Sequence, residues 1–362
     1  MRPMSRTPTL LAFLFLAPAG CAHIGPGTIV ADRVPYNNAV AASWKEQTLL
    51  NIVKLRYLDT PFFIDVPQIT SGYALQGTTT GIASIVPPVN PAASFAQQLA
   101  ASLNYQESFL DRPTISYTPQ TGAVFIRNLT NPIQPGSVFR LLQSGYPADV
   151  VFNLAVETIN GLDNRSVSGG QLRAAEPEFT RLVRALRRAQ VSGHAGIRIE
   201  VDKDRTESIV FFFRTQNIDP DLARELDGVK RDLGLNLERR EFKITFGGVA
   251  RNPEEISILT RSVLRILSEL STFVEVPPEH LAAGIARDLG APDGGAEPYF
   301  QVLSGDKQPC DAFAAVCYEG RWFWIDKRDT ASKRTMAYIL VLLALADTGA
   351  KENLPVVTIP AG

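Results

Sequence analysis

The densest mixture of aromatic and charged side chains lies near the C-terminal end of the chain, in residues 322–334. Trp322 and Trp324 are two positions apart, so in an extended strand they share one face. Tryptophans beside arginines are typical of a surface that recognises a sugar, a peptide or a polymer, with Arg328 and Arg334 as contacts for anions. The same pattern also fits a strand that is buried on both faces and followed by an ion-paired helix cap. These four residues form the candidate binding surface.

The histidines and acidic pairs do not have the spacing of a catalytic or metal site. None of His23, His194 and His280 has a second histidine four residues away, as a helical metal site requires. The chain also has no Gly-x-Ser-x-Gly motif and no glycine motif for phosphate binding. Glu254 and Glu255 are better explained as the first turn of a helix than as a catalytic pair. We therefore expect no metal, no cofactor and no catalytic residue.

Cys310 and Cys317 have two interpretations. An exported chain can hold a disulfide, but two cysteines seven positions apart on one strand are about 20 Å apart, too far for a bridge. The bridge therefore requires residues 309–311 to fold back over the strand. Alternatively, Cys317 is a small apolar core residue.

Charge and composition exclude several classes of protein. The 362 residues include 36 Lys and Arg against 37 Asp and Glu, and 45% are hydrophobic. This balance is ordinary for a folded protein and argues against a dedicated nucleic-acid binder, so we expect no nucleic-acid partner. Three cysteines cannot build a disulfide scaffold.

The first twenty residues have the three parts of a secretory signal peptide. Arg2 and Arg6 make a positive start, and residues 10–16 form an apolar run that is too short to span a bilayer. Small residues follow and end at Cys21. We therefore expect residues 1–20 to be removed.

The Ala-Gly-Cys ending of this segment resembles the lipobox of bacterial lipoproteins, with Pro18 where that motif usually has Leu. The resemblance implies that Cys21 carries acyl chains, and two or three chains would anchor the protein stably in a membrane. It also implies the outer membrane, because Ala22 and not Asp follows the cysteine. The protein would then face the periplasm.

The first part of the mature chain is expected to be irregular and extended apart from one helix. Residues 21–35 are rich in Gly and Pro and predict a tether that carries the lipid. Apolar spacing predicts an N-terminal helix over 36–61. Residues 62–118 predict an extended, flexible arm, with a short helix over 92–103. This arm either folds on its own domain, pairs with other subunits or inserts in a membrane.

The remainder predicts an α+β fold, with a body over 119–250 and a C-terminal region over 251–362. The helix near residue 180 carries a stripe of Arg181, Arg184 and Arg188, which either contacts anionic lipid head groups or is a solvated face. Short, mostly antiparallel strands are expected at 150–159, 197–201, 208–213, 241–246, 299–303, 312–318, 321–326 and 354–359. Helices are expected at 120–130, 136–144, 179–193, 220–234, 252–270 and 329–346.

Part of the chain resembles an uncharacterised group of bacterial envelope lipoproteins. The resemblance lies in Tyr36-Asn37, Glu46, residues 49–57, Asp59 and Pro61, and in the helix with Lys333-Arg334 near the end. It implies no activity and no ligand. We expect a non-enzymatic, lipid-anchored envelope protein that binds an envelope partner or itself. The alternatives are an oligomeric outer-membrane assembly, in which the 62–118 arm supplies strands shared between subunits, and an enzyme that acts on envelope polymers.

Overall fold

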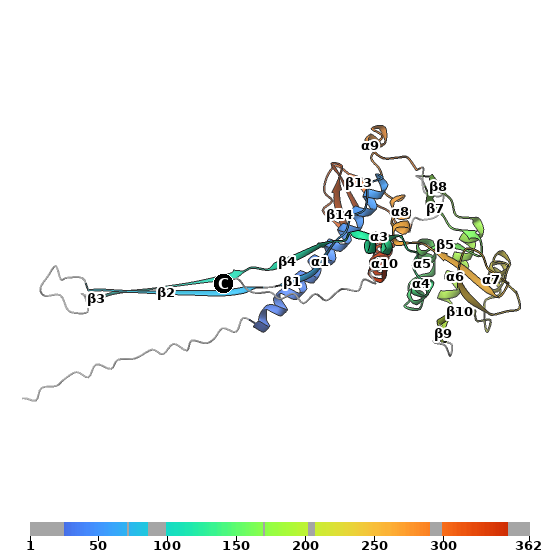
Figure 1. The fold of residues 1–362 in the computed structure, drawn as a ribbon, viewed down its shortest axis with the longest axis horizontal. Helices are drawn as coiled ribbons and strands as arrows, with labels where there is room; N and C mark the ends of the chain where they lie inside the picture. Colours follow the sequence, from blue (N-terminus) through green and yellow to red (C-terminus); the bar gives the residue numbers. More distant parts are fainter. Residues whose placement is uncertain are drawn as a thin grey trace, which may run out of the picture. The chain divides into compact units, whose positions relative to one another are not determined.

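The computed structural model describes residues 25–70, 72–85, 99–168, 171–201, 207–289 and 299–346. Within these ranges the chain has the predicted α+β fold, with helices and mostly antiparallel strands (Figure 1). The chain divides into two compact units, residues 1–39 with 68–115 and residues 40–67 with 116–362. The predicted signal peptide, Cys21 and the predicted strand over 354–359 lie outside the described residues.

The first helix is longer than the sequence predicts. Helix α1 spans Gly25–Arg56, so the tether prediction is wrong for residues 25–35. Pro26 fits because it lies in the first turn, where a backbone N–H has no helical partner. Pro35 lies inside the helix, where it removes one backbone hydrogen bond. Counting Gly and Pro as helix breakers therefore placed the start of the helix eleven residues late.

The predicted arm is built from paired strands. Strands β2 (Tyr73–Ile85) and β3 (Leu99–Asp111) form an antiparallel hairpin, and the predicted helix over 92–103 is wrong for 99–103. Strands β1 (Ile64–Thr70) and β4 (Thr114–Pro119) form a second two-stranded sheet. The extended pattern that the sequence predicts is thus confirmed over β1, β2, β4 and residues 104–111 of β3.

Two amide side chains of α1 hold the segment that leads into β1. Asn51 donates from Nδ2 to the Phe62 carbonyl (2.9 Å) and accepts from the Phe62 N–H (2.8 Å). One turn earlier, Gln47 donates to the Ile64 carbonyl (3.1 Å) and accepts from the Ile64 N–H (2.7 Å). Residues four apart on a helix lie on one face, so the two amides satisfy alternate backbone positions as a neighbouring strand would.

A six-stranded sheet forms the centre of the second unit. Its order is β6-β5-β12-β11-β10-β9, and only β11 and β12 are parallel. Because β12 comes from the predicted C-terminal region, that region and the predicted body share one sheet. The strands are β5 (Val156–Ile159), β6 (Leu162–Asp163), β9 (Ala195–Val201), β10 (Glu207–Phe213), β11 (Glu241–Phe246) and β12 (Glu255–Thr260).

Helices from the middle of the chain pack on this sheet and on each other. The ends of four of them, α3, α4, α6 and α7, largely match the predicted positions. Asp219 caps α7 by accepting from the Asp221 N–H (3.0 Å). A small hairpin of β7 (Ser166–Ser168) and β8 (Gln171–Arg173) precedes α6. The helices are α3 (Gly122–Thr130), α4 (Pro135–Gln143), α5 (Ala148–Ala155), α6 (Pro177–Val191) and α7 (Pro220–Asp232).

Two predicted elements are wrong in type. Most of the predicted strand over 150–159 is helix α5, and only its last four residues form β5. Nearly every residue of α5 is buried, so its apolar residues show no helical period. The predicted helix over 252–270 is strand β12 followed by α8 (Val263–Ser271), which Ser262 caps. Asn252 accepts from the Glu254 N–H (2.9 Å), which makes a turn where the sequence predicts a helix start.

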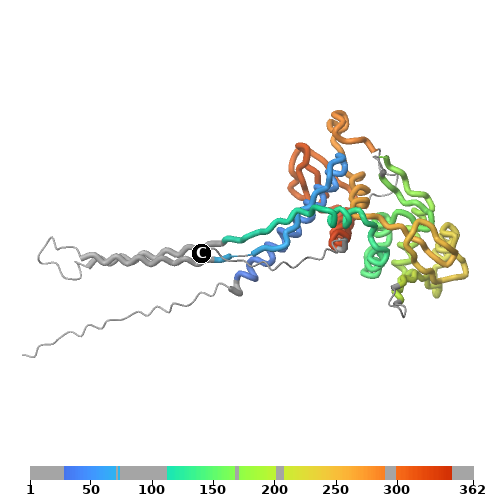
Figure 2. The backbone as a smooth tube through the Cα atoms, viewed as in Figure 1, coloured from blue at the N-terminus to red at the C-terminus, as the bar shows by residue number. Residues whose placement is uncertain are grey.

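The last part of the chain adds a three-stranded sheet and three helices. The sheet has the order β13-β15-β14, with β13 (Leu303–Gly305), β14 (Ala312–Tyr318) and β15 (Arg321–Asp326). The predicted hairpin at Glu319-Gly320 is confirmed, and both turn residues have positive φ, 46° and 73°. The other elements of this region are the helices α9 (Pro278–Ala282) and α10 (Thr330–Ala346). The backbone trace shows the small sheet beside the end of α1 (Figure 2).

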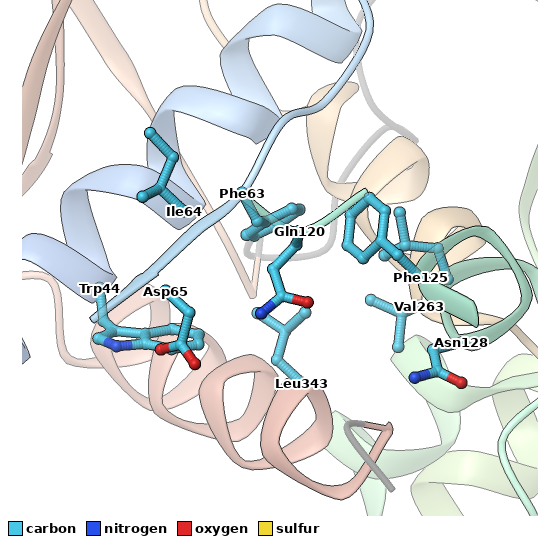
Figure 3. Close-up of a pocket in the computed structure, with 10 residues that line it drawn as sticks. Trp44, Phe63, Ile64, Asp65, Gln120, Phe125, Asn128, Val263 and Leu343 are labelled. Carbon is cyan, nitrogen blue, oxygen red and sulfur yellow. The ribbon is translucent and has the colours of Figure 1, made fainter. Parts of the chain in front are cut away.

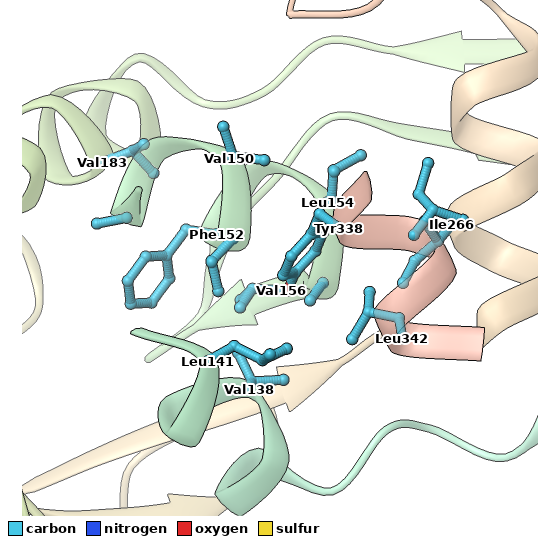
Figure 4. Packing of buried hydrophobic residues seen from close by; sticks show 14 of the residues in the cluster. Val138, Leu141, Val150, Phe152, Leu154, Val156, Val183, Ile266, Tyr338 and Leu342 are labelled. Atoms are coloured by element: carbon cyan, nitrogen blue, oxygen red, sulfur yellow. The ribbon is translucent and has the colours of Figure 1, made fainter. Parts of the chain in front are cut away.

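The predicted apolar helix near the C-terminus is the centre of the core. On α10, Tyr338 and Leu342 are at most 1% exposed and lie between Leu154 of α5 and Ile266 of α8 (Figure 4). One hydrophobic cluster therefore joins the six-stranded sheet and its helices to the C-terminal helices. No helix within the described ranges has both the length and the apolar character needed to cross a membrane.

Candidate functional site

Strand β15 has one buried face and one half-buried face. Phe323 and Ile325 are fully buried, whereas Trp322 and Trp324 on the opposite face are only half-buried. The sequence left open a strand that is buried on both faces, and the structure gives full burial on one face and intermediate burial on the other. The two indoles keep part of their surface accessible to solvent. The buried side chains of Phe323 and Ile325, on the opposite face, hold the strand in place.

Small and apolar residues surround the indoles on the neighbouring strands. Trp324 is opposite Leu303 and Ala315, and Trp322 is opposite Gly305 and Cys317. A Cβ atom on Gly305 would lie only 3.2 Å from the Trp324 ring, so glycine at this position allows the ring to lie against β13. We call Trp322, Trp324, Leu303, Ala315 and Cys317 the aromatic surface.

The two cysteines are free thiols. Cys317 is exposed on the aromatic surface, so the prediction of a core residue is wrong. Cys310 is also exposed and unbridged, and it precedes β14. The predicted fold-back that would bring the two cysteines into a disulfide does not occur.

Charged residues border the small sheet, and most of them are paired with each other. Arg328, one of the predicted anion contacts, is 85% exposed and lies 3.5 Å from Asp326. Arg321 pairs with Glu279 and Asp306. The other predicted contact, Arg334, is exposed on α10, and no interaction of the described residues brings it to Arg328. The structure thus brings together the two tryptophans but not the two arginines.

An aromatic cluster at the end of α1 supports β15 from its buried side. The Tyr57 ring makes edge contacts with Tyr318 and Phe323, and its hydroxyl lies 2.7 Å from His280 Nδ1. Burial raises the pKa of Tyr57 to about 12. Tyr318 donates a hydrogen bond to Asp59 (3.1 Å). Tyr57 and Asp59, both from the 49–61 block, therefore contact the C-terminal sheet directly.

Arg56 ties the same helix end to the chain on the other side. Its guanidinium donates to the Val274 carbonyl (3.4 Å) and to the Arg287 carbonyl (2.5 Å). Burial lowers the pKa of Arg56, against the charge of Asp288. Both acceptors are backbone carbonyls, one on each side of α9 in the chain. Arg56 therefore holds the backbone near α9 in place.

A buried network of ion pairs lies between α8 and the loop before β7. Arg165 contacts Glu269 at 3.0 Å, and their side chains are 8% and 2% exposed. Arg261, 1% exposed, binds Glu157 at 2.7 Å, and Arg265 binds the other oxygen of Glu157 at 2.9 Å. Sequence reasoning missed this network, because its members lie in four different segments of the chain.

Burial has opposite outcomes for the two acids of this network. Burial raises the pKa of Glu269, and the nearby arginines only partly oppose it. Burial would also raise the pKa of Glu157, but the hydrogen bonds and charges of Arg265 and Arg261 outweigh it and lower that pKa. Both shifts are explained by local packing and by the neighbouring arginines.

Two cavities of different volume lie beside α1. Figure 3 shows one between α1, β1, α3 and α10, with Trp44, Phe63 and Leu343 in its wall. Its volume of about 60 Å³ is far below that of a typical ligand pocket. A second cavity of about 350 Å³ lies beside Arg56 and Arg287.

The remaining candidates from the sequence have structural roles. On α6, Arg181 pairs with Asp232 of α7 (3.1 Å), and Arg188 pairs with Asp219 (3.7 Å) and Glu225. These pairs join α6 to α7, whereas Arg184, the third member of the stripe, is exposed. His194 Nδ1 lies 3.0 Å from Ser192 Oγ. In the part of the chain that the structure describes, no cluster of His, Cys, Asp and Glu could hold a metal ion.

Comparison with known proteins gives no match. The chain matches no family model, no curated protein and no solved structure.

Proposed function

We propose that this chain is a non-enzymatic, lipid-anchored protein of the bacterial outer membrane that faces the periplasm and acts by binding an envelope polymer. The observation that carries the proposal is the aromatic surface, with two half-buried indoles on a strand whose other face is completely buried. A rigid pair of indoles gains affinity because little conformational entropy is lost when a ligand binds.

The spacing of the indoles favours a repeating polymer with apolar faces. Trp322 and Trp324 are separated by about 7 Å along β15, because each strand residue advances about 3.3 Å. Each indole offers a flat apolar face and one N–H donor, which suits sugar rings in a glycan strand. Unpaired charge is scarce at this surface, since Arg321, Lys327 and Arg328 each have an acidic neighbour. Glycan strands of the cell wall are therefore the proposed ligand.

The binding test uses the full mature chain in mild detergent and purified cell-wall glycan. We expect Trp322→Ala and Trp324→Ala each to weaken co-sedimentation at least tenfold, because central aromatic contacts dominate such surfaces. Phe246→Ala is the matched control, since Phe246 is an aromatic residue that is 59% exposed on another sheet. Equal binding by all four proteins would contradict the proposal.

The anchor is tested separately. Cells fed an alkyne-tagged fatty acid should label the wild-type chain, and Cys21→Ser should abolish the label. Labelling that survives the substitution would contradict the assignment of Cys21 as the acylated residue.

A further inference from the structure

The hairpin of β2 and β3 is long, regular and two-stranded. Its register runs without a shift through thirteen pairs, from Tyr73↔Asp111 to Ile85↔Leu99. Each strand therefore extends about 40 Å. No third strand pairs with it among the described residues, so the outer edges of β2 and β3 are open there. Open edges of this length are a liability in water, because they pair with other chains.

The hairpin belongs to a stretch without any charge. From residue 66 to residue 106 the chain has no Asp, Glu, Lys, Arg or His. At the overall charged content of 20%, forty-one residues would carry about eight charges. The only charged residues of the two strands are Glu107 and Asp111, both near the end where the hairpin joins the chain. Edge strands that face water usually carry charged side chains, which prevent aggregation. Beyond the two acids at its base, this hairpin has no such charges.

The register sorts the residue types into two sets. Successive register pairs belong to opposite faces of the ladder, so alternate pairs share a face. One set is mainly apolar beyond its base, where Tyr73↔Asp111 and Gly77↔Glu107 each hold an acid: Leu75↔Phe109, Thr79↔Tyr105, Gly81↔Leu103, Ala83↔Ala101 and Ile85↔Leu99. The other set is uncharged and, apart from Ala74↔Leu110 near the base, mainly polar: Gln76↔Ser108, Thr78↔Gln106, Thr80↔Asn104, Ile82↔Ser102 and Ser84↔Ala100.

We propose that this hairpin inserts into the lipid bilayer and pairs edge to edge with the hairpins of further copies of the chain. A strand of nine to eleven tilted residues crosses the hydrocarbon core, so thirteen residues are sufficient. In hydrocarbon every backbone N–H and C=O must be paired, which a lone two-stranded hairpin cannot achieve. A second copy is the natural partner because it offers the same length, the same register and the same lack of charge.

The beginning of the chain connects this hairpin to the proposed anchor. Residues 25–39 of α1 fall in the same compact unit as β2 and β3, and the Tyr73 hydroxyl donates to the Asp32 carboxylate. Cys21 precedes α1 by four positions. The inference rests on the proposed envelope location, but it does not require acylation or the aromatic surface.

Single cysteines test the insertion. In the full mature chain with Cys310→Ser and Cys317→Ser, we introduce Ala83→Cys or Ala101→Cys, and the reference chain carries Cys310→Ser alone and so keeps Cys317. Isolated membranes are treated with a membrane-impermeant maleimide. Both positions belong to the apolar set, so labelling should be at least tenfold slower than at native Cys317 and should recover in detergent. Labelling as fast as at Cys317 would overturn the insertion.

Extraction and native mass complete the test. Behind an ordinary cleavable signal peptide, the Cys21→Ser chain should stay in membranes through an alkaline carbonate wash, and the same chain without residues 73–111 should be released. In mild detergent the full chain should have the mass of an oligomer. Release of the first chain, or a strictly monomeric full chain, would contradict the inference and leave the acylation and glycan-binding results unaffected.

Discussion

At the scale of single residues, the structure gives a physical reason for the side chains at the end of α1. Asn51 is fully buried and makes two hydrogen bonds to the backbone of Phe62, while Gln47 makes the equivalent pair to Ile64 in a more exposed setting. Apolar spacing predicted a helix here, and its residues Leu49, Ile52 and Val53 are fully buried. It could not predict the partner of Asn51, because an amide can pair with any backbone segment that folds beside it.

These two amides give a matched comparison. We expect Asn51→Ala to lower the free energy of unfolding by about 2 kcal/mol, because two backbone groups in a part-buried site lose their partner. Gln47→Ala should cost less than about 1 kcal/mol, because water can replace its contacts. Urea unfolding of both variants measures the difference, and equal losses would contradict the role of Asn51.

The buried hydroxyls beside β15 predict a loss of stability at high pH. Burial raises the pKa of Tyr57 to about 12, and burial with the hydrogen bond to Asp59 raises the pKa of Tyr318 to about 12. The folded state therefore keeps protons that the unfolded state releases near pH 10. Their contribution to stability is complete below pH 10 and is lost as the pH rises toward about 12.

Tyr57→Phe tests this assignment. Unfolding free energies from pH 8 to pH 12 should fall less steeply for the Phe variant than for the wild type, since one of the shifted groups is gone. An unchanged slope would show that Tyr57 does not hold its proton more tightly in the folded state.

At the scale of elements, local signals succeeded where one segment determines its own structure. Asp219-Pro220 predicts the start of α7, and Glu319-Gly320 predicts the turn between β14 and β15. They failed where burial determines the element. Helix α5 is apolar on nearly every side, and β11 and β12 run parallel although only residues 247–254 connect them. So short a connection has no room for a crossover helix.

The ion pair between Arg165 and Glu269 makes a prediction about α8. Arg165→Met should destabilise the fold by about 3 kcal/mol or more, because Glu269 stays buried without its partner. The double variant Arg165→Met/Glu269→Leu should recover much of that loss, because neither member of this pair is then left buried without its partner. Arg181→Met is the control, since its side chain is 54% exposed and its ion pairs should contribute far less to stability. A double variant as unstable as the single one would contradict this view of the network.

At the scale of the whole molecule, the candidate site was only partly visible in the sequence. The shared face of Trp322 and Trp324 follows from strand periodicity and is confirmed. The support behind it is not visible, because Tyr57 and His280 are 223 positions apart and meet only when α1 packs against the C-terminal region. The anchor at Cys21 and the envelope location remain proposals that the tests above address.

The most direct test of the account is a fluorescence titration of the indoles themselves. The chain has three tryptophans, so Trp44→Phe leaves only the pair on the aromatic surface as emitters. We expect titration with soluble glycan fragments of the cell wall to shift the emission in a saturable way, and Trp322→Ala in the same background to weaken the apparent affinity at least tenfold. Emission that stays constant at saturating glycan, with the protein folded, would contradict the claim that this surface binds the envelope polymer.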